Sequence, residues 1–216
     1  MFLTRKSQMV APEQTLPGRS ERNFPLAEKH RVLDAPLVTD EIPEGYAVAF
    51  FGLGCFWGAE EIYWQVPGVW STSVGYAGGT TPHPSYEEVS SGATNHTEAV
   101  RIVFDPDRVS FADLVKTFFE VHDPTQGFRQ GNDVGTQYRS AIYYADPEQE
   151  QVARELTRVY GDELKRRRLG DITTEIRPAA ETPYYYAEDH HQQYLAKNPF
   201  GYRCHANAGV KFPETA

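Results

Sequence analysis

The sequence predicts an α+β fold in which helices cover a sheet in two layers. Segments with strand character alternate along the chain with segments of helical periodicity, and the links between them are both short and long. The 216 residues are 40% hydrophobic and 13% aromatic, enough to close a substantial core. Because this length exceeds that of a typical domain by about half, we expect one domain with an extension.

The first 44 residues are expected to form the extension. Five prolines interrupt this segment, and no sustained hydrophobic period runs through it. We expect an arm that either lies extended on the body or is partly disordered. Its first residues carry charges without a following apolar stretch, so no secretory signal is predicted.

The catalytic domain is expected over residues 45–216. Apolar runs and alternation predict its strands, and the i, i+3, i+4, i+7 spacing predicts its helices. The clearest helix follows Ser110, whose hydroxyl can cap it, and repeats Phe111, Leu114 and Phe118 on one face. In chain order the expected elements are strand 47–51, helix 59–64, strand 69–76, short helix 86–89, strand 97–104, a helix from 111, strand 140–145, a long helix from 147, strand 172–178 and short helix 188–197.

Two segments lack such periodicity. Residues 122–139 are polar and Gly-rich, and a loop of this length in a compact domain is usually functional. The tail from about residue 198 looks irregular, and its Gly and Asn residues predict mobility. We expect the whole to be a ferredoxin-like two-layer sandwich with a mixed sheet, helices and a long irregular C-terminal tail.

Charge and hydropathy exclude several classes of function. The formal net charge of −9 argues against a nucleic-acid surface, because phosphate binding needs clustered Lys and Arg without compensating acids. The one basic run, residues 165–168, lies where a helix is expected to end, and cations are favourable there. No apolar run approaches the roughly 20 residues of a membrane-spanning helix. We expect a cytoplasmic monomer that binds neither nucleic acid nor membrane.

The chain has two cysteines, Cys55 and Cys204. Two cysteines far apart in sequence exclude a multi-bridge disulfide framework. In a reducing compartment they are inert core residues, metal ligands or a redox pair, and composition alone leaves all three possibilities open.

Cys55 lies at a predicted strand-to-helix turn between Gly54 and Gly58. A cysteine at a helix N-terminus meets the positive end of the helix dipole and free backbone N–H groups, which favour the nucleophilic thiolate. The glycines leave room for a backbone or ligand, while Phe56 and Trp57 place two apolar faces beside the sulfur. The pattern favours a reactive cysteine over a buried structural one.

Around Cys55 the sequence resembles the peptide methionine sulfoxide reductase A family, which reduces the S epimer of methionine sulfoxide. The run from Gly54 to Gly58 is similar to the nucleophile motif of that family, and the resemblance extends over residues 46–210. Further matching runs follow in order: GYAGG at 75–79, YEEV at 86–89, HTEAV at 96–100, HDP at 122–124, GNDVGTQYRS at 131–140, YAEDHHQQY at 186–194 and KNPFGY at 197–202.

The resemblance implies how the sulfoxide is reduced. Cys55 would attack the sulfoxide sulfur, since a sulfoxide carries a polarised S–O bond and a positive sulfur. Glu98, whose pKa would be raised by desolvation near Phe56 and Trp57, would act as general acid toward the departing oxygen. The same two aromatic side chains would enclose the terminal methyl group of the substrate.

The resemblance also implies polar contacts to the substrate. Tyr86 and Tyr138 would donate hydrogen bonds to the sulfoxide oxygen, for which a phenolic hydroxyl is a suitable donor. Asp133 would accept a hydrogen bond from the substrate backbone N–H.

Regeneration is implied in the same way. Cys55 would become a sulfenic acid, and Cys204 would condense with it to an intramolecular disulfide that thioredoxin or another external dithiol reduces. The sequence departs here from the family's familiar pattern, because Arg203, which could favour a thiolate, occupies the position after Gly-Tyr and the cysteine comes one residue later. No cofactor and no resident metal are implied. The substrates would be oxidised proteins, repaired in this way, and free methionine sulfoxide.

Three other functions are compatible with a reactive or ligating cysteine. The runner-up is a cysteine-dependent hydrolase or acyl transferase with His96, His191 or His205 as base. A zinc site of both cysteines and two histidines would have poor ligand spacing. A non-catalytic binding module would have no use for both an attacking and a resolving thiol.

Overall fold

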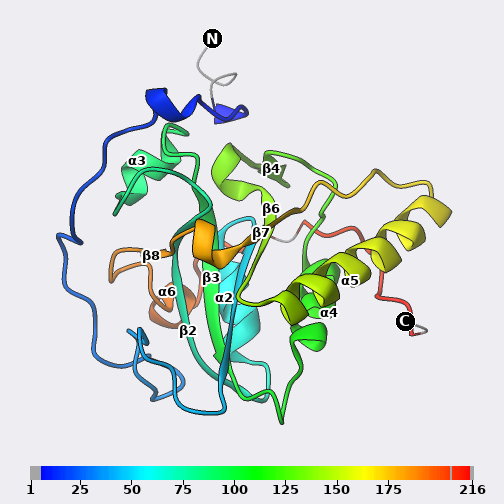
Figure 1. Cartoon of the computed structure of the whole chain (residues 1–216), viewed down its shortest axis with the longest axis horizontal. Helices are drawn as coiled ribbons and strands as arrows, with labels where there is room; N and C mark the ends of the chain where they lie inside the picture. Colours follow the sequence, from blue (N-terminus) through cyan, green and yellow to red (C-terminus); the bar gives the residue numbers. More distant parts are fainter. Residues whose placement is uncertain (1–5, 205, 215–216) are drawn as a thin grey trace.

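The structure, a computed structural model, describes residues 6–204 and 206–214 and has a six-stranded mixed sheet at its centre (Figure 1). Its strands are β1 (Ala47–Leu53), β2 (Val69–Ala77), β3 (Thr97–Phe104), β6 (Ser140–Tyr144), β7 (Glu175–Pro178) and β8 (Tyr185–Tyr186). They are ordered β7-β6-β1-β3-β2-β8, and neighbours are antiparallel except for the parallel pair β6 and β7. A separate antiparallel pair is formed by β4 (Arg129–Gln130) and β5 (Asp133–Val134).

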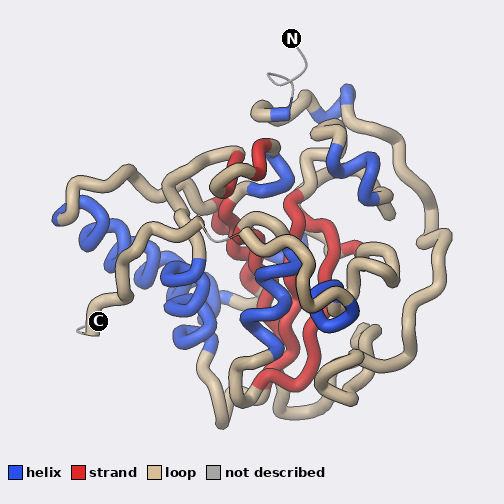
Figure 2. Tube along the Cα trace, turned by 180° about the vertical axis from the view of Figure 1, so that it is seen from behind, coloured by secondary structure: helices blue, strands red, loops and turns tan. Residues whose placement is uncertain are grey.

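Helices connect these strands and cover one face of the sheet. They are α2 (Phe56–Trp64), α3 (Tyr86–Ser90), α4 (Phe111–Val121), α5 (Pro147–Arg166) and α6 (Tyr194–Lys197), with short 3-10 turns η1 (Pro12–Gln14), η2 (Thr136–Tyr138) and η3 (Ala179–Glu181). Figure 2 shows α2 lying over the strands, with α4 and α5 to one side. The fold is therefore a mixed α+β arrangement, as the sequence predicts. Within the described residues, no helix combines the length and hydropathy needed to cross a membrane.

The main core lies between the sheet and helices α2, α4 and α5. The periodicity of α4 places Leu114 and Phe118 in this core, where both are fully buried against Phe51 of β1 and Ile102 of β3. Each such side chain stabilises the fold by about 1.5–3 kcal/mol relative to exposure. This packing fixes the ends of β1 and β3 and the start of α2, the backbone that carries the candidate site.

The N-terminal segment, residues 6–44, runs along the outside of the body (blue in Figure 1). Arg19 forms a two-point ion pair with Glu88 of α3, with N–O distances of 2.7 and 3.0 Å. Further along, His30 is buried and its Nε2 lies 2.8 Å from Thr72 Oγ1 of β2. The described part of this arm is thus attached to the body by side-chain contacts.

Two expected elements are at least three residues shorter in the structure, and the other expected elements differ by smaller amounts or are longer. The helix expected over 188–197 forms only as α6, because Gln193 adopts a left-handed backbone (φ 45°, ψ 44°) and donates from Nε2 to Glu60 Oε1 at 2.7 Å. The strand expected over 172–178 begins at Glu175. The two-residue strands β4, β5 and β8 are too short to leave a periodic pattern in the sequence.

Candidate active site

Cys55 is the N-cap of α2, directly after β1, and is 9% exposed. Gly54 before it has φ of +96°, and a Cβ at this glycine would lie 2.7 Å from Cγ of Gln130. Both the backbone conformation and the lack of space require glycine here. The Cys55 side chain makes no capping hydrogen bond to α2, but the backbone N–H groups of Trp57 and Gly58 lie close enough to the sulfur to favour its charged form.

The surroundings of Cys55 raise the pKa of its thiol well above the ordinary value. Burial is the largest cause, and the negative charges of Glu98 and Asp133 act in the same direction, while the N–H groups of Trp57 and Gly58 lower the pKa. The expectation that the helix N-terminus holds Cys55 as a thiolate is therefore wrong for the free protein. Desolvation raises the pKa of the thiol more than the helix N-terminus lowers it. Cys55 is a thiol until something else in the site changes.

Glu98 lies on β3 with its carboxyl group buried beside the start of α2. Its Oε2 accepts a hydrogen bond from the Phe56 N–H at 3.0 Å. Burial and, to a smaller extent, the charge of Asp133 raise the pKa of Glu98 to about 8, although the Phe56 N–H acts in the opposite direction. This direction agrees with the raised pKa that the resemblance implies for Glu98. At neutral pH the carboxyl group is protonated and can donate a proton.

Two tyrosine hydroxyls face the same space. Tyr86 is the first residue of α3, which Ser85 caps, and Tyr138 ends η2. Burial raises the pKa of both hydroxyls, and the next cause in each case is the charge of Glu98. The charge of Cys55 also contributes to the raised pKa of each tyrosine. These mutual effects place the four groups together, and both hydroxyls remain protonated and able to donate hydrogen bonds.

Aromatic rings form one wall of the site. Phe56 is buried and stacks on Tyr86 with ring centroids 6.5 Å apart, while Trp57 lies 6.4 Å from Phe56. Trp57 is fixed from behind, because Tyr194 of α6 stacks on it at 3.9 Å and its Nε1 donates to His191 Nδ1 at 3.1 Å. The wall can bind a small apolar group in a defined position.

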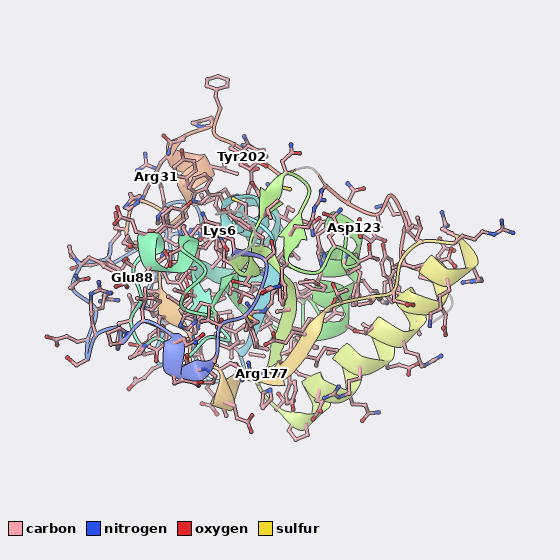
Figure 3. All side chains as sticks on the ribbon, turned by 90° about the horizontal axis from the view of Figure 1, so that it is seen from above. Lys6, Arg31, Glu88, Asp123, Arg177 and Tyr202 are labelled. Atoms are coloured by element: carbon pink, nitrogen blue, oxygen red, sulfur yellow. The ribbon has the colours of Figure 1, made fainter. Side chains whose placement is uncertain are left out.

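Asp133 of β5 is half-buried at the rim of the site. Burial raises the pKa of its carboxyl group. The hydroxyl of Tyr202 donates a hydrogen bond to its Oδ2 at 3.2 Å. Figure 3 shows Tyr202 at the edge of the molecule, on the side opposite Arg177. The Asp133 carboxylate, to which the resemblance assigns a hydrogen bond from the substrate backbone N–H, is therefore already hydrogen-bonded to a residue of the C-terminal tail.

Cys204 is also brought to this region, and both thiols are free. It is half-buried, and its Sγ donates to the carbonyl oxygen of Gln130 at 3.5 Å. It lines a cavity of about 310 Å³ together with Gly131 and Tyr202. Gln130 thus contacts Cys204 through its carbonyl oxygen and lies beside Gly54, the residue before Cys55, through its side chain.

All eight residues singled out for the reductase site thus lie in one region, and the structure adds others to which the resemblance assigned no role. Glu188 accepts hydrogen bonds from the Tyr76 hydroxyl and the Tyr86 N–H, both at 2.8 Å, and so fixes the start of α3. His191 and Tyr194 support Trp57. Glu188, His191 and Tyr194 all fall in the matched run 186–194, which marks the segment without giving the role of each residue.

The alternative chemistries have little support in the site. His96 is buried, with Nε2 2.7 Å from the Thr81 carbonyl oxygen and Nδ1 accepting from the Gly79 N–H, which makes it a structural residue. His191 is committed to Trp57 through Nδ1, and burial lowers its pKa to about 4. His205 lies outside the described residues. In the part of the chain that the structure describes, no cluster of His, Cys, Asp and Glu suits a metal ion.

A buried thiol, a protonated carboxyl group and an apolar wall, with a second free thiol nearby, define a thiol-dependent oxidoreductase. A sequence model of the family "Peptide methionine sulfoxide reductase" matches residues 47–215. The chain is 54% identical to peptide methionine sulfoxide reductase MsrA of Salinispora arenicola, over 99% of this chain and 96% of that relative.

Solved structures agree with this match. The fold is similar to that of methionine sulfoxide reductase A of Corynebacterium diphtheriae, with a TM-score of 0.86, 49% identity and coverage of 96% of this chain and 100% of that one. It is also similar to Mxr1 from Saccharomyces cerevisiae in reduced form, with a TM-score of 0.67, 32% identity and coverage of 76% and 91%. The chain belongs to the peptide methionine sulfoxide reductase family and is an oxidoreductase, which confirms the resemblance seen in the sequence.

Proposed function

We propose that this protein reduces the S epimer of methionine sulfoxide, free and protein-bound, to methionine and thereby repairs oxidised proteins. Membership of the family supports the reaction. The observation that carries the proposal is the pair Cys55 and Glu98: the carboxyl group, held by the Phe56 N–H, is protonated at neutral pH beside a thiol at a helix N-terminus.

In the first step the Cys55 sulfur attacks the sulfoxide sulfur while Glu98 donates a proton to the sulfoxide oxygen. The bond between the two sulfurs and the bond between the substrate sulfur and its oxygen then break as the protonated oxygen moves to the Cys55 sulfur, which leaves methionine and a Cys55 sulfenic acid. Glu98 recovers its proton from the Cys55 thiol. One thiol and one sulfoxide thus give one sulfenic acid and one thioether. The carboxylate that is left after Glu98 has donated its proton accepts the proton of Cys55, so the thiol can lose its proton as it reacts and no free thiolate has to form beforehand.

The substrate would be held by apolar and polar groups together. Phe56 and Trp57 would bind the methyl group, while the Tyr86 and Tyr138 hydroxyls donate to the sulfoxide oxygen. Asp133 would accept from the substrate backbone N–H. Donors on one side and an apolar wall on the other fix which face of the sulfur meets Cys55, and this supports selectivity for one epimer.

In the second step the Cys204 sulfur bonds to the Cys55 sulfur. The S–O bond of the sulfenic acid breaks, and the hydroxyl group leaves as water with the proton of the Cys204 thiol. Thioredoxin then supplies two thiols and takes up the disulfide by exchange, so that both cysteines are free again. The cycle needs an external dithiol and no resident cofactor.

The proposal extends to the setting of the reaction. We assign the strand–helix order β1-α2-β2-β3-α4-β6 to a ferredoxin-like sandwich, which forms the catalytic domain over residues 45–216, preceded by an arm over 1–44 and ending in a mobile tail. We place the protein as a monomer in the cytoplasm, where thiols are kept reduced and disulfides are transient.

The test is turnover of separated S and R epimers with thioredoxin, its reductase and NADPH, following methionine and NADPH together. We expect one methionine for each NADPH consumed with the S epimer and no turnover with the R epimer. Equal rates with both epimers, or methionine release without any demand for reductant, would contradict the proposal.

A further inference from the structure

Arg203 organises the part of the tail that precedes Cys204. Its Nη1 donates to the carbonyl oxygens of Pro199 and Gly201 at 2.9 and 3.2 Å. Its Nε and Nη2 donate to the two carboxylate oxygens of Glu61, each at 2.6 Å. Four hydrogen bonds from one guanidinium group therefore fold the tail loop and attach it to α2.

The attachment point lies on the helix that begins at Cys55. Glu61 is about 9 Å from Cys55 along the helix axis, at about 1.5 Å per residue. Cys204 follows Arg203 directly, and consecutive Cα atoms are about 3.8 Å apart. The ion pair thus keeps the chain next to Cys204 within a side-chain length of the helix that carries the other thiol.

The attachment is strong enough to persist and separate enough to allow movement of the thiol. The side chains of Arg203 and Glu61 are only 28% and 23% exposed, which limits screening by salt, and the two-point geometry is specific. The Cys204 thiol itself makes a weak contact to the Gln130 carbonyl oxygen at 3.5 Å and interacts with the neighbouring Tyr202 hydroxyl. Cys204 can leave Gln130 while Arg203 remains on Glu61.

We propose that Arg203 is a positioning residue whose ion pair with Glu61 tethers the tail and raises the effective concentration of the Cys204 thiol at the Cys55 sulfenic acid. The inference rests on the two-step function proposed above. The tether acts on the second step, in which the S–S bond forms and water leaves, because that step joins groups from two separate segments. The residue that stands where the familiar family pattern has a cysteine thus guides the cysteine that follows it.

The experiment separates the two steps in a single turnover. Reduced protein is mixed with the S epimer without any reductant, and methionine release and loss of free thiols are followed in time. For Arg203→Ala we expect methionine release at the wild-type rate and disulfide formation slowed about fivefold, the effect of losing one partly buried ion pair. Glu61→Gln should give the same result.

A charge exchange provides the decisive control. The double variant Arg203→Glu with Glu61→Arg should restore most of the rate of disulfide formation, whereas Arg158→Ala, which removes an ion pair with Glu155 on α5, should change neither rate. An unchanged thiol-loss rate in Arg203→Ala, or a double variant as slow as the single ones, overturns the tether. Failure of the wild type to release methionine would contradict the proposed function instead.

Discussion

The two cysteines lie in regions that are built in different ways. Cys55 is buried where β1 meets α2, and its neighbours are fixed by the sheet and the main core. Cys204 is half-buried in a segment, residues 198–214, whose described residues form neither helix nor strand. Side-chain contacts attach that segment, among them the ion pair from Arg203 and the hydrogen bond from the Tyr160 hydroxyl to the Val210 carbonyl oxygen at 2.9 Å.

This difference matches the needs of the two steps. Attack on a sulfoxide requires a nucleophile, an acid and a methyl pocket in fixed positions, since small errors of placement are costly for catalysis. Closing a disulfide requires instead that one thiol approach another until the Cα atoms are about 4.4–6.8 Å apart. A rigid site suits the first step, and a tail held at two points on either side of its cysteine suits the second.

The sharpest way to break the comparison is to remove each sulfur in turn. Cys55→Ser should abolish reduction of the S epimer, because the hydroxyl is a far poorer nucleophile for sulfur. Cys204→Ser should release about one methionine per chain in the first turnover and then stop with thioredoxin as reductant. Methionine is measured with and without thioredoxin. Sustained turnover in Cys204→Ser with thioredoxin would remove that residue from regeneration.

Removing the general acid, Glu98, should have the next largest effect on the rate of sulfoxide reduction. Glu98→Gln should lower the rate of the first turnover by about 10²–10⁴-fold, the usual contribution of a general acid. Because the pKa of Glu98 is raised to about 8, the wild-type rate should fall as the pH rises through about 8 and the carboxyl group loses its proton. Single-turnover rates from pH 6 to 9 test this, and the variant should lack that decline.

Buried histidines should make the rigid half sensitive to acid. Burial lowers the pKa of His96 and His122 to about 4, below their value in the unfolded chain. The unfolded state therefore binds more protons between these values, so the stability present above pH ~6.5 is lost as the pH falls through about 4. Each of the two histidines should lower the free energy of unfolding by on the order of 1–3 kcal/mol over this pH range. The urea concentration at the midpoint of unfolding should therefore decline steadily as the pH is lowered from about 6.5 to about 4. A midpoint that does not change with pH would contradict this role of the two histidines.

The smallest expected effect on the kinetics comes from the contact between the tail and the rim of the active site, where Tyr202 meets Asp133. Tyr202→Phe removes the hydrogen bond to Asp133 at 3.2 Å and so frees the carboxylate for the substrate backbone. We expect KM for a peptide substrate to fall about two- to threefold with kcat unchanged, since a partly exposed hydrogen bond of this kind lies at the low end of the usual contribution, about 0.5 kcal/mol. Steady-state kinetics with thioredoxin measure both constants. A higher KM would show that Tyr202 assists binding.

The same contrast explains how far the sequence could predict the molecule. The strand-to-helix turn at Cys55 and the periodicity of α4 depend on local patterns and were predicted from them, whereas the raised pKa of Glu98 was expected only because the resemblance implied it. The raised pKa of Cys55 was not predicted, because it comes from burial and from the charges of Glu98 and Asp133, which are distant in sequence.

Long-range pairs escaped prediction for a related reason. The contact between Arg203 and Glu61 joins positions 142 apart, and the charge of one gives no sign of the other. The helix expected over 188–197 is short because Gln193 turns to reach the buried Glu60, again a tertiary effect. Local periodicity is informative where an element packs regularly, and much less so where single side chains hold an irregular segment.

The central claim is that the sulfoxide oxygen passes to Cys55. The most direct measurement uses Cys204→Ser, so that the product cannot be resolved, and an S epimer whose oxygen is a heavy isotope. Intact mass and peptide mapping after one turnover should find the labelled oxygen on Cys55, with about one methionine released per chain. An unmodified Cys55 despite methionine release, or unlabelled oxygen on it, would contradict the account.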